Sequence, residues 1–165
     1  MEKNKSVIAI DPGYDRVGIA VFSAGGALTH SECFTPQTKV FAERLLAIQK
    51  RVRELVHEFS PSAFALETLF FSVNQKTALK VAEARGALLV TAAELELAIY
   101  EYSPQEIKIA VTGSGNADKK AVAGMVSRLA AIETRGKMDD ELDAIALGMA
   151  HQAGFLLSTH IAAGR

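Results

Sequence analysis

Four acidic residues far apart in the sequence carry most of its chemical information: Asp11, Glu67, Asp140 and Asp143. Asp11 ends the apolar run 7–10, and Glu67 ends a second apolar run, 63–66. A carboxylate at the end of a buried strand costs free energy unless positive charge meets it. Several converging carboxylates are typical ligands of a divalent cation. Such sites catalyse phosphodiester cleavage, so these residues predict a metal-dependent nuclease.

Regular secondary structure could bring the four acids together. If the runs 7–10 and 63–66 are neighbouring parallel strands, Asp11 and Glu67 meet at one edge of the sheet. Asp140 and Asp143 are three residues apart, which places them on one face of a helix. Four carboxylates at close range repel one another. Two magnesium ions about 4 Å apart would relieve this repulsion and activate a water for in-line attack at phosphorus.

Each acid also has an ordinary structural explanation. Asp11 begins an Asp-Pro-Gly turn sequence, and acids such as those at 139–141 are favoured at helix N-termini. Asp139 is therefore a rival of Asp140 for any role in a site. Glu67 is the hardest to explain in this way, because glutamate is a poor strand former and this one follows four apolar residues.

Aromatic and basic side chains near the acids suggest a nucleic-acid partner. A phenylalanine just after Glu67 could stack on bases or wedge between them. Two lysines spaced four apart on a helix could hold phosphates, and so could lysines in the basic segment 103–137. The alternative is that these lysines form an ordinary solvated surface, because the net charge of the chain is only −1. The candidate DNA contacts are Phe70, Lys76, Lys80, Lys108, Lys119 and Lys120.

The hydrophobic pattern predicts an α/β domain with the order β-β-β-α-β-α-β-α-α-α. Strands are expected at 7–10, 17–22, 28–34, 63–66 and 99–102, and helices at 39–58, 75–97, 104–111, 116–132 and 140–155. Three strands joined by short loops form an antiparallel meander, and a crossover helix makes the fourth strand parallel to the first. We therefore expect a mixed five-stranded sheet with helices on both faces, and we expect Asn116 to cap the fourth helix.

Length and composition narrow the class of protein. The 165 residues, 49% of them hydrophobic, predict a single domain over 1–157 and a short frayed tail over 158–165. Cys33 is the only cysteine, which excludes a disulfide within the chain and suits a reducing cytoplasm. The apolar run before Asp11 is too short for a signal peptide or a membrane span. The helix at 75–97 is apolar on more than one side, as expected at the seam of a homodimer.

Short motifs along nearly the whole chain point to one family. The first is Ile-Asp-Pro-Gly at 10–13 with Val-Gly at 17–18. The central block consists of Glu-Thr-Leu-Phe at 67–70, Asn74, Ala-Leu-Lys at 78–80 and Ala-Arg-Gly at 84–86. The last two are the glycine-rich basic loop at 113–119 and the acids at 140 and 143 followed by Ala-Ile-Ala. In this order and register, from about Ile8 to His151, the sequence resembles the RuvC Holliday junction resolvases. The central block is the most specific part, because other RNase H-like proteins share the opening motif.

The resemblance implies an RNase H-like fold, a homodimer, and cleavage of four-way DNA junctions with two Mg²⁺ ions, for which Mn²⁺ could substitute. It implies symmetric nicks with 5′-phosphate and 3′-hydroxyl ends, made alongside a branch-migration complex of the RuvA-RuvB type. Carried over by position, the metal ligands and catalytic residues would be Asp11, Glu67, Asp140 and Asp143. Phe70 would meet the bases near the crossover, and Lys108 and Lys119 would contact phosphates. The tail carries little positive charge and would add little to DNA affinity.

Two other classes of function fit parts of the sequence. Asp-Pro-Gly followed by a hairpin also resembles the phosphate loop of actin-like and sugar-kinase-like ATP binders, but those proteins need two domains around a cleft. A non-catalytic DNA-binding module, or a nuclease with another substrate, could use the same fold. A module without catalysis would gain nothing from keeping four acids that repel one another.

Overall fold

The computed structural model describes residues 6–69, 75–154 and 160–161, and the order of its elements is the predicted one with one strand added. The strands are β1 Val7–Asp11, β2 Val17–Phe22, β3 Leu28–Phe34, β4 Ala63–Glu67, β5 Ala98–Tyr102 and β6 His160–Ile161. The helices are α1 Phe41–Phe59, α2 Gln75–Glu94, α3 Pro104–Thr112, α4 Lys119–Ala130 and α5 Asp139–Gln152. None of the described helices is both long enough and apolar enough to cross a membrane.

The strands form one mixed sheet in the order β3-β2-β1-β4-β5-β6. The first three strands are an antiparallel meander, whereas β4 pairs in parallel with both β1 and β5, so the predicted topology is confirmed. In the pairing of β1 with β4, Ile10 lies opposite Leu66. The next residues along the two strands are Asp11 and Glu67, which therefore end at the same edge of the sheet.

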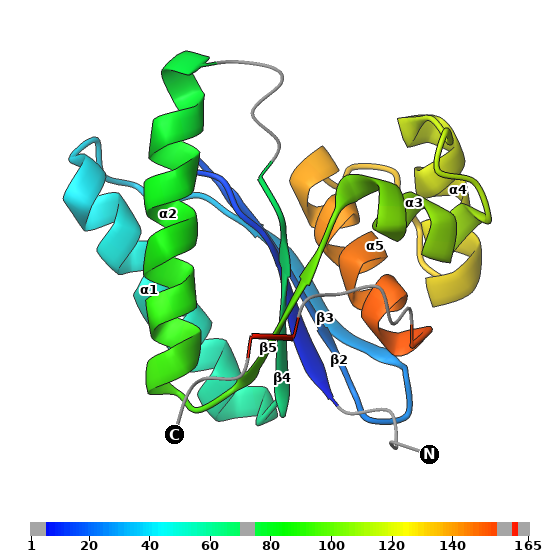
Figure 1. Ribbon diagram of the computed structural model, residues 1–165, viewed down its shortest axis with the longest axis horizontal. Helices are drawn as coiled ribbons and strands as arrows, with labels where there is room; N and C mark the ends of the chain where they lie inside the picture. Colours follow the sequence, from blue (N-terminus) through cyan, green and yellow to red (C-terminus); the bar gives the residue numbers. More distant parts are fainter. Residues whose placement is uncertain (1–5, 70–74, 155–159, 162–165) are drawn as a thin grey trace.

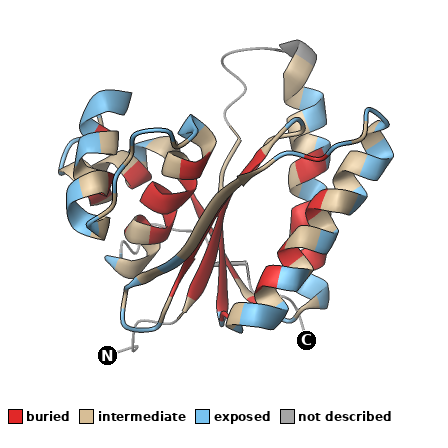
Figure 2. Cartoon of the chain, turned by 180° about the vertical axis from the view of Figure 1, so that it is seen from behind, coloured by how far each residue is buried: buried red, intermediate tan, exposed pale blue. Residues whose placement is uncertain are grey.

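Helices cover both faces of the sheet, with α1 and α2 on one side and α3, α4 and α5 on the other (Figure 1). Alternate residues of β1 separate the two cores: Ile8 and Ile10 pack toward α1 and α2, and Val7 and Ala9 pack in the core that contains α5. The central strands β1, β2 and β4 and the inner faces of the helices are largely buried, and the outer faces of the helices are exposed (Figure 2). This layering follows from the fully apolar central strands, which need cover on both faces.

Two glycines allow α5 to lie directly against β2. A Cβ added to Gly18 would lie 1.8 Å from the backbone oxygen of Asp140, and one added to Gly148 would lie 2.3 Å from the ring of Phe22. Gly18 is also the residue opposite Asp11 in the pairing of β1 with β2. The missing side chain at Gly18 therefore places the N-terminus of α5 next to the end of β1.

Two local details differ from the sequence-based expectations. Asn116 does not cap α4; that prediction is wrong. The N-cap is Asp118, whose side chain accepts a hydrogen bond of 2.7 Å from the backbone N–H of Ala121. A carboxylate there also complements the positive end of the helix, which the amide of Asn116 could not do. The sheet also gains β6, two residues antiparallel to β5, within the segment expected to be a frayed tail.

We predict that Gly18→Ala destabilises the protein, because the new methyl group must displace the backbone of α5. Overpacking of this kind costs about 1–3 kcal/mol. Urea unfolding would measure the loss of free energy. Gly124→Ala is the matched control: nothing lies within 4 Å of a Cβ added there, in the middle of α4. Equal stability of Gly18→Ala and wild type would contradict the close approach of α5 to β2.

Candidate active site

Asp11 and Glu67 form a hydrogen-bonded pair of carboxyl groups at the ends of β1 and β4. Burial is the main reason that the pKa of Asp11 lies well above its ordinary value, and the negative charges of Glu67, Asp143 and Asp140 raise it further. Burial also raises the pKa of Glu67, while its hydrogen bond with Asp11 acts in the opposite direction. A hydrogen bond between two carboxyl groups requires one proton, which the pair shares.

Asp143 reaches the same region from the first half of α5. Glu67 and Asp143 line a pocket of about 250 Å³ together with Lys108 of α3 and Lys119 of α4. Burial raises the pKa of Asp143, and the positive charges of Lys119 and Lys108 partly offset that effect. In return, Asp143 is the main cause of the raised pKa of Lys119. The pocket therefore joins two candidate metal ligands to two candidate phosphate contacts.

The acids at the start of α5 have different partners. Asp140 forms an ion pair with Arg16, which lies in the loop between β1 and β2. Asp139 is exposed and lies 3.5 Å from the ammonium group of Lys119. The charge of Asp140 contributes to the raised pKa of Asp11. The charges of both Asp139 and Asp140 raise the pKa of Asp143.

Glu141, the third acid of this turn, anchors α5 to the sheet. It is buried, accepts a hydrogen bond of 2.7 Å from the hydroxyl of Ser31 on β3, and forms an ion pair with Lys137. These contacts account for its charge without any role in the pocket. They also fix the rotation of α5, which sets the directions in which Asp140 and Asp143 point.

Arg44 of α1 orders the loop that carries Arg16. Its guanidinium donates to the backbone oxygens of Tyr14, at 3.1 Å, and Thr38, at 2.7 Å, and to the side chain of Asp15, at 2.9 Å. One side chain thus ties the β1–β2 loop to the loop that precedes α1. Sequence reasoning identified neither Arg16 nor Arg44, because no spacing in the chain marks an arginine whose partners are distant in sequence.

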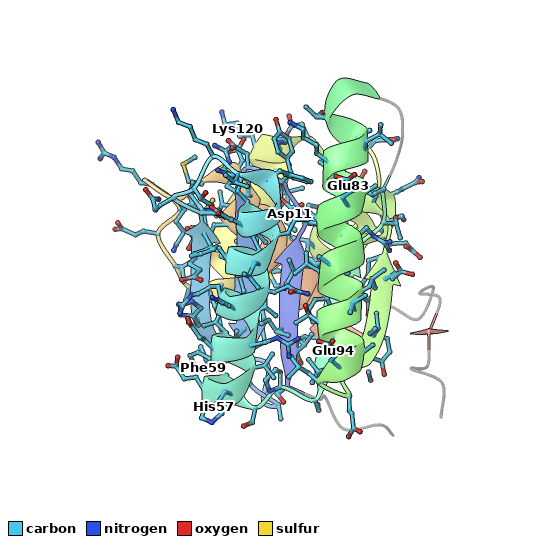
Figure 3. All side chains as sticks on the ribbon, turned by 90° about the vertical axis from the view of Figure 1, so that its left-hand side faces the viewer. Asp11, His57, Phe59, Glu83, Glu94 and Lys120 are labelled. Atoms are coloured by element: carbon cyan, nitrogen blue, oxygen red, sulfur yellow. The ribbon has the colours of Figure 1, made fainter. Side chains whose placement is uncertain are left out.

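The remaining candidate DNA contacts are spread more widely. Lys120, in the first turn of α4, lies toward the same end of the molecule as Asp11, whereas His57 and Glu94 are at the opposite end (Figure 3). Lys80 places its ammonium group over the ring of Tyr14, at 5.3 Å from the centroid. Phe70 and the side chain of Lys76 lie outside the part of the chain that the structure describes.

The donor set fits a hard divalent cation. Within the described residues, no three His, Cys, Asp or Glu side chains lie close enough to hold a metal ion as they stand. Asp11 and Glu67 are engaged with each other, and Asp140 is engaged with Arg16. Yet burial raises the pKa values of Asp11, Glu67 and Asp143, so the protein by itself disfavours the charged form of all three. Carboxylate oxygens in this state are suited to Mg²⁺, which prefers oxygen ligands.

Comparison with known proteins identifies the family. The model of the family described as crossover junction endodeoxyribonuclease RuvC matches residues 7–151. The chain belongs to the RuvC family. A RuvC from Natranaerobius thermophilus is 36% identical over 161 residues, covering 94% of this chain and 99% of that protein. A RuvC from Thermosipho melanesiensis is 38% identical, covering 86% and 92% of the two chains.

Solved structures agree with this assignment. The structure of Thermus thermophilus RuvC has a TM-score of 0.83 and 32% identity, with 94% of this chain and 99% of that chain covered. A second structure, T. thermophilus RuvC in complex with a Holliday junction substrate, has a TM-score of 0.81 and 34% identity, and covers 88% and 92% of the two chains. The expected RNase H-like fold is confirmed, as is membership of a family of nucleases.

We predict that Asp11→Asn stabilises the metal-free protein at neutral pH. Folding raises the pKa of Asp11 above its ordinary value of 3.8, so folding favours the protonated form. The charge of Asp11 therefore lowers the free energy of unfolding. This loss is complete at pH values above the raised pKa of the folded protein, and it disappears as the pH falls to the ordinary pKa of an aspartate. Asparagine carries no charge and removes the loss. We expect melting at pH 7 in EDTA to rise by about 2–4 °C for each kcal/mol recovered.

The advantage of Asp11→Asn should shrink as the pH is lowered. Glu58→Gln is the control, because Glu58 is exposed on α1 at the other end of the molecule from the pocket. A lower melting temperature for Asp11→Asn than for wild type at pH 7 would show that the charge of Asp11 is balanced within the protein.

Proposed function

We propose that this chain is a metal-dependent endonuclease that resolves four-way DNA junctions by symmetric paired nicks. The observation that carries the proposal is the group of partly buried acids at one edge of the sheet, Asp11, Glu67 and Asp143, beside Lys108 and Lys119. Excess negative charge on one wall of a pocket and positive charge on the other suits a phosphodiester held next to a cation. Membership of the RuvC family supports the junction as substrate.

Asp11, Glu67, Asp140 and Asp143 would hold two Mg²⁺ ions, with Mn²⁺ as a substitute of similar ligand preference. Magnesium, when bound, lowers the pKa of water and offsets the charge that develops at phosphorus. The protein's own part is to present the four carboxylates at one place. For this, the Asp11–Glu67 pair must release its shared proton to solvent, and Asp140 must exchange Arg16 for the ion. Attack by water at phosphorus, in line with the 3′ oxygen that leaves and takes up a proton, would yield 5′-phosphate and 3′-hydroxyl ends.

DNA would approach across the pocket from the side of α3 and α4. Lys108 and Lys119 line the pocket and would contact the phosphates nearest the cleaved bond. Lys120, Lys80 and Lys76 would contact the backbone farther away, and Phe70 would stack on bases near the crossover. Support for the junction comes from T. thermophilus RuvC, whose structure was solved with a Holliday junction substrate.

A homodimer would supply the second active site that paired nicks require. Leu79 and Val90 of α2 are 71% and 54% exposed, although both are large and apolar. They are eleven residues apart, about three helical turns, so they lie on the same face of α2. Burial of that face against a second copy would remove both from water. We further propose that the dimer works in the cytoplasm with a branch-migration complex of the RuvA-RuvB type.

We predict that Glu67→Gln abolishes cleavage while leaving junction binding intact. Glutamine keeps the shape of the side chain but is a weaker ligand, so cleavage should fall by about a hundredfold or more. Binding should be equal or tighter, because a negative charge near the phosphates is removed. Cleavage of a synthetic four-way junction, with and without Mg²⁺ and against plain duplex, would measure the first effect, and gel shifts the second. Wild-type rates for Glu67→Gln would exclude the proposed site.

Val90→Lys should dissociate the homodimer. A charged side chain at the centre of an apolar seam has no partner and loses its hydration, so association should weaken by about two orders of magnitude. Sedimentation velocity at several protein concentrations would show the change. Leu129→Lys is the matched control, since Leu129 is exposed and apolar but lies on α4. If only the control variant became monomeric, the seam would involve α4 and not α2.

A further inference from the structure

Arg85 connects α2 to the ends of two strands beside the proposed metal site. Its side chain is 18% exposed and forms an ion pair with Glu101 of β5, whose side chain is 10% exposed. The Nε–H of the same guanidinium points to the backbone oxygen of Glu67, at 3.3 Å. One largely buried cation therefore contacts both the last residue but one of β5 and the last residue of β4.

The pairing of the strands explains how one side chain reaches both partners. Leu66 lies opposite Glu101, and Glu67 lies opposite Tyr102, so Glu101 is one residue back from Glu67 on the neighbouring strand. A guanidinium is planar and carries five N–H donors in fixed directions, which allows it to serve two acceptors at once. A lysine ammonium is a single point charge on a flexible stem and would not hold both in this geometry.

Glu67 needs such support because it stands where the sheet ends. The pairing of β4 with β1 stops at Leu66, and the pairing with β5 stops at Glu67. Just beyond, the backbone N–H of Thr68 donates to Tyr102 at 2.9 Å, and the described segment ends at residue 69. A bond to the carbonyl of Glu67 limits rotation of the peptide that follows its side chain, and so limits where the carboxylate can point.

Stability alone gives a poor account of this ion pair. Taking two charges out of water costs about as much as their attraction returns, and apolar residues of similar size are often as stabilising. The neighbouring positions on the inner face of α2, Ala84, Leu88 and Ala92, are apolar and buried. A charged residue in this row is better explained by the atoms that it orients.

We propose that Arg85 is a positioning residue for Glu67: the guanidinium, held in place by Glu101, fixes the end of β4 so that the Glu67 carboxylate faces the metal. This inference rests on the proposed role of Glu67 as a ligand. Loss of a residue that orients a metal ligand typically weakens metal binding by about 10–100-fold. The same loss should raise the magnesium concentration needed for cleavage more than it changes the KM for the junction.

The test compares two variants that separate stability from positioning. Arg85→Met/Glu101→Met removes the donor to Glu67 and leaves no unpaired buried charge, so it should melt near the wild-type temperature. Glu101→Gln keeps Arg85 within reach of Glu67 but leaves the guanidinium without its counter-charge, so it should melt lower. Metal binding is measured without DNA, by titrating Mn²⁺ and following the free ion by electron paramagnetic resonance.

We expect the double variant to bind Mn²⁺ about 10–100-fold more weakly than wild type and Glu101→Gln to bind it within about twofold. Arg85→Lys, which keeps a cation beside Glu101, should resemble the double variant and serves in its place if the latter does not fold. Arg53→Met is the control: it breaks the ion pair of α2 with α1 at Glu94 and should leave Mn²⁺ binding unchanged.

Two results would overturn the inference. One is wild-type Mn²⁺ affinity in the double variant or in Arg85→Lys. The other is affinity that simply follows melting temperature, with Glu101→Gln the weakest binder, since that pattern describes a purely structural ion pair. Glu67→Gln distinguishes failure of the inference from failure of the proposed function. If Glu67→Gln also binds Mn²⁺ as wild type does, Glu67 is not a ligand; if it loses binding while the Arg85 variants keep it, only the role of Arg85 is wrong.

Discussion

The gathering of partly buried carboxyl groups, which lose hydration and repel one another, is the constraint on which this site depends. Asp11 lies at the end of a strand that is otherwise fully buried, and three further acids contribute to its raised pKa. The protein offsets this charge only in part: a proton is held between Asp11 and Glu67, Arg16 pairs with Asp140, and Lys119 faces Asp143. If the site holds metal ions as proposed, each of these partners would be exchanged for a cation, and the site would trade stability for metal binding.

A rigid frame is needed to keep mutually repelling groups together. The parallel pairing of β1 with β4 fixes Asp11 beside Glu67, and the close approach of α5 to Gly18 brings Asp140 over them. Glu141 fixes the rotation of α5 through Ser31. These contacts lie in well-packed layers that cannot shift without opening a core. The acids therefore cannot relieve their repulsion by moving apart.

Positive charge lies beside the acids at the place where DNA is proposed to bind. The net charge is −1, so the whole molecule has no strong attraction for a polyanion. Lys108 and Lys119 nevertheless line the pocket that contains Glu67 and Asp143. Local placement of a few lysines, rather than total charge, would thus determine where a phosphate can settle.

The sequence by itself determined the order of the main elements and the acids at the strand ends, because apolar runs and periodicity are local properties. It also predicted that β4 is parallel to β1, but whether the two strands are neighbours was decided by the fold. Tertiary structure alone decided the cap at Asp118 in place of Asn116 and the partners of Arg16 and Arg85. These depend on which side chains from distant segments meet after packing. Which carboxylate pairs with which guanidinium depends on their distance and burial in the folded chain. The spacing of residues along the sequence determines neither.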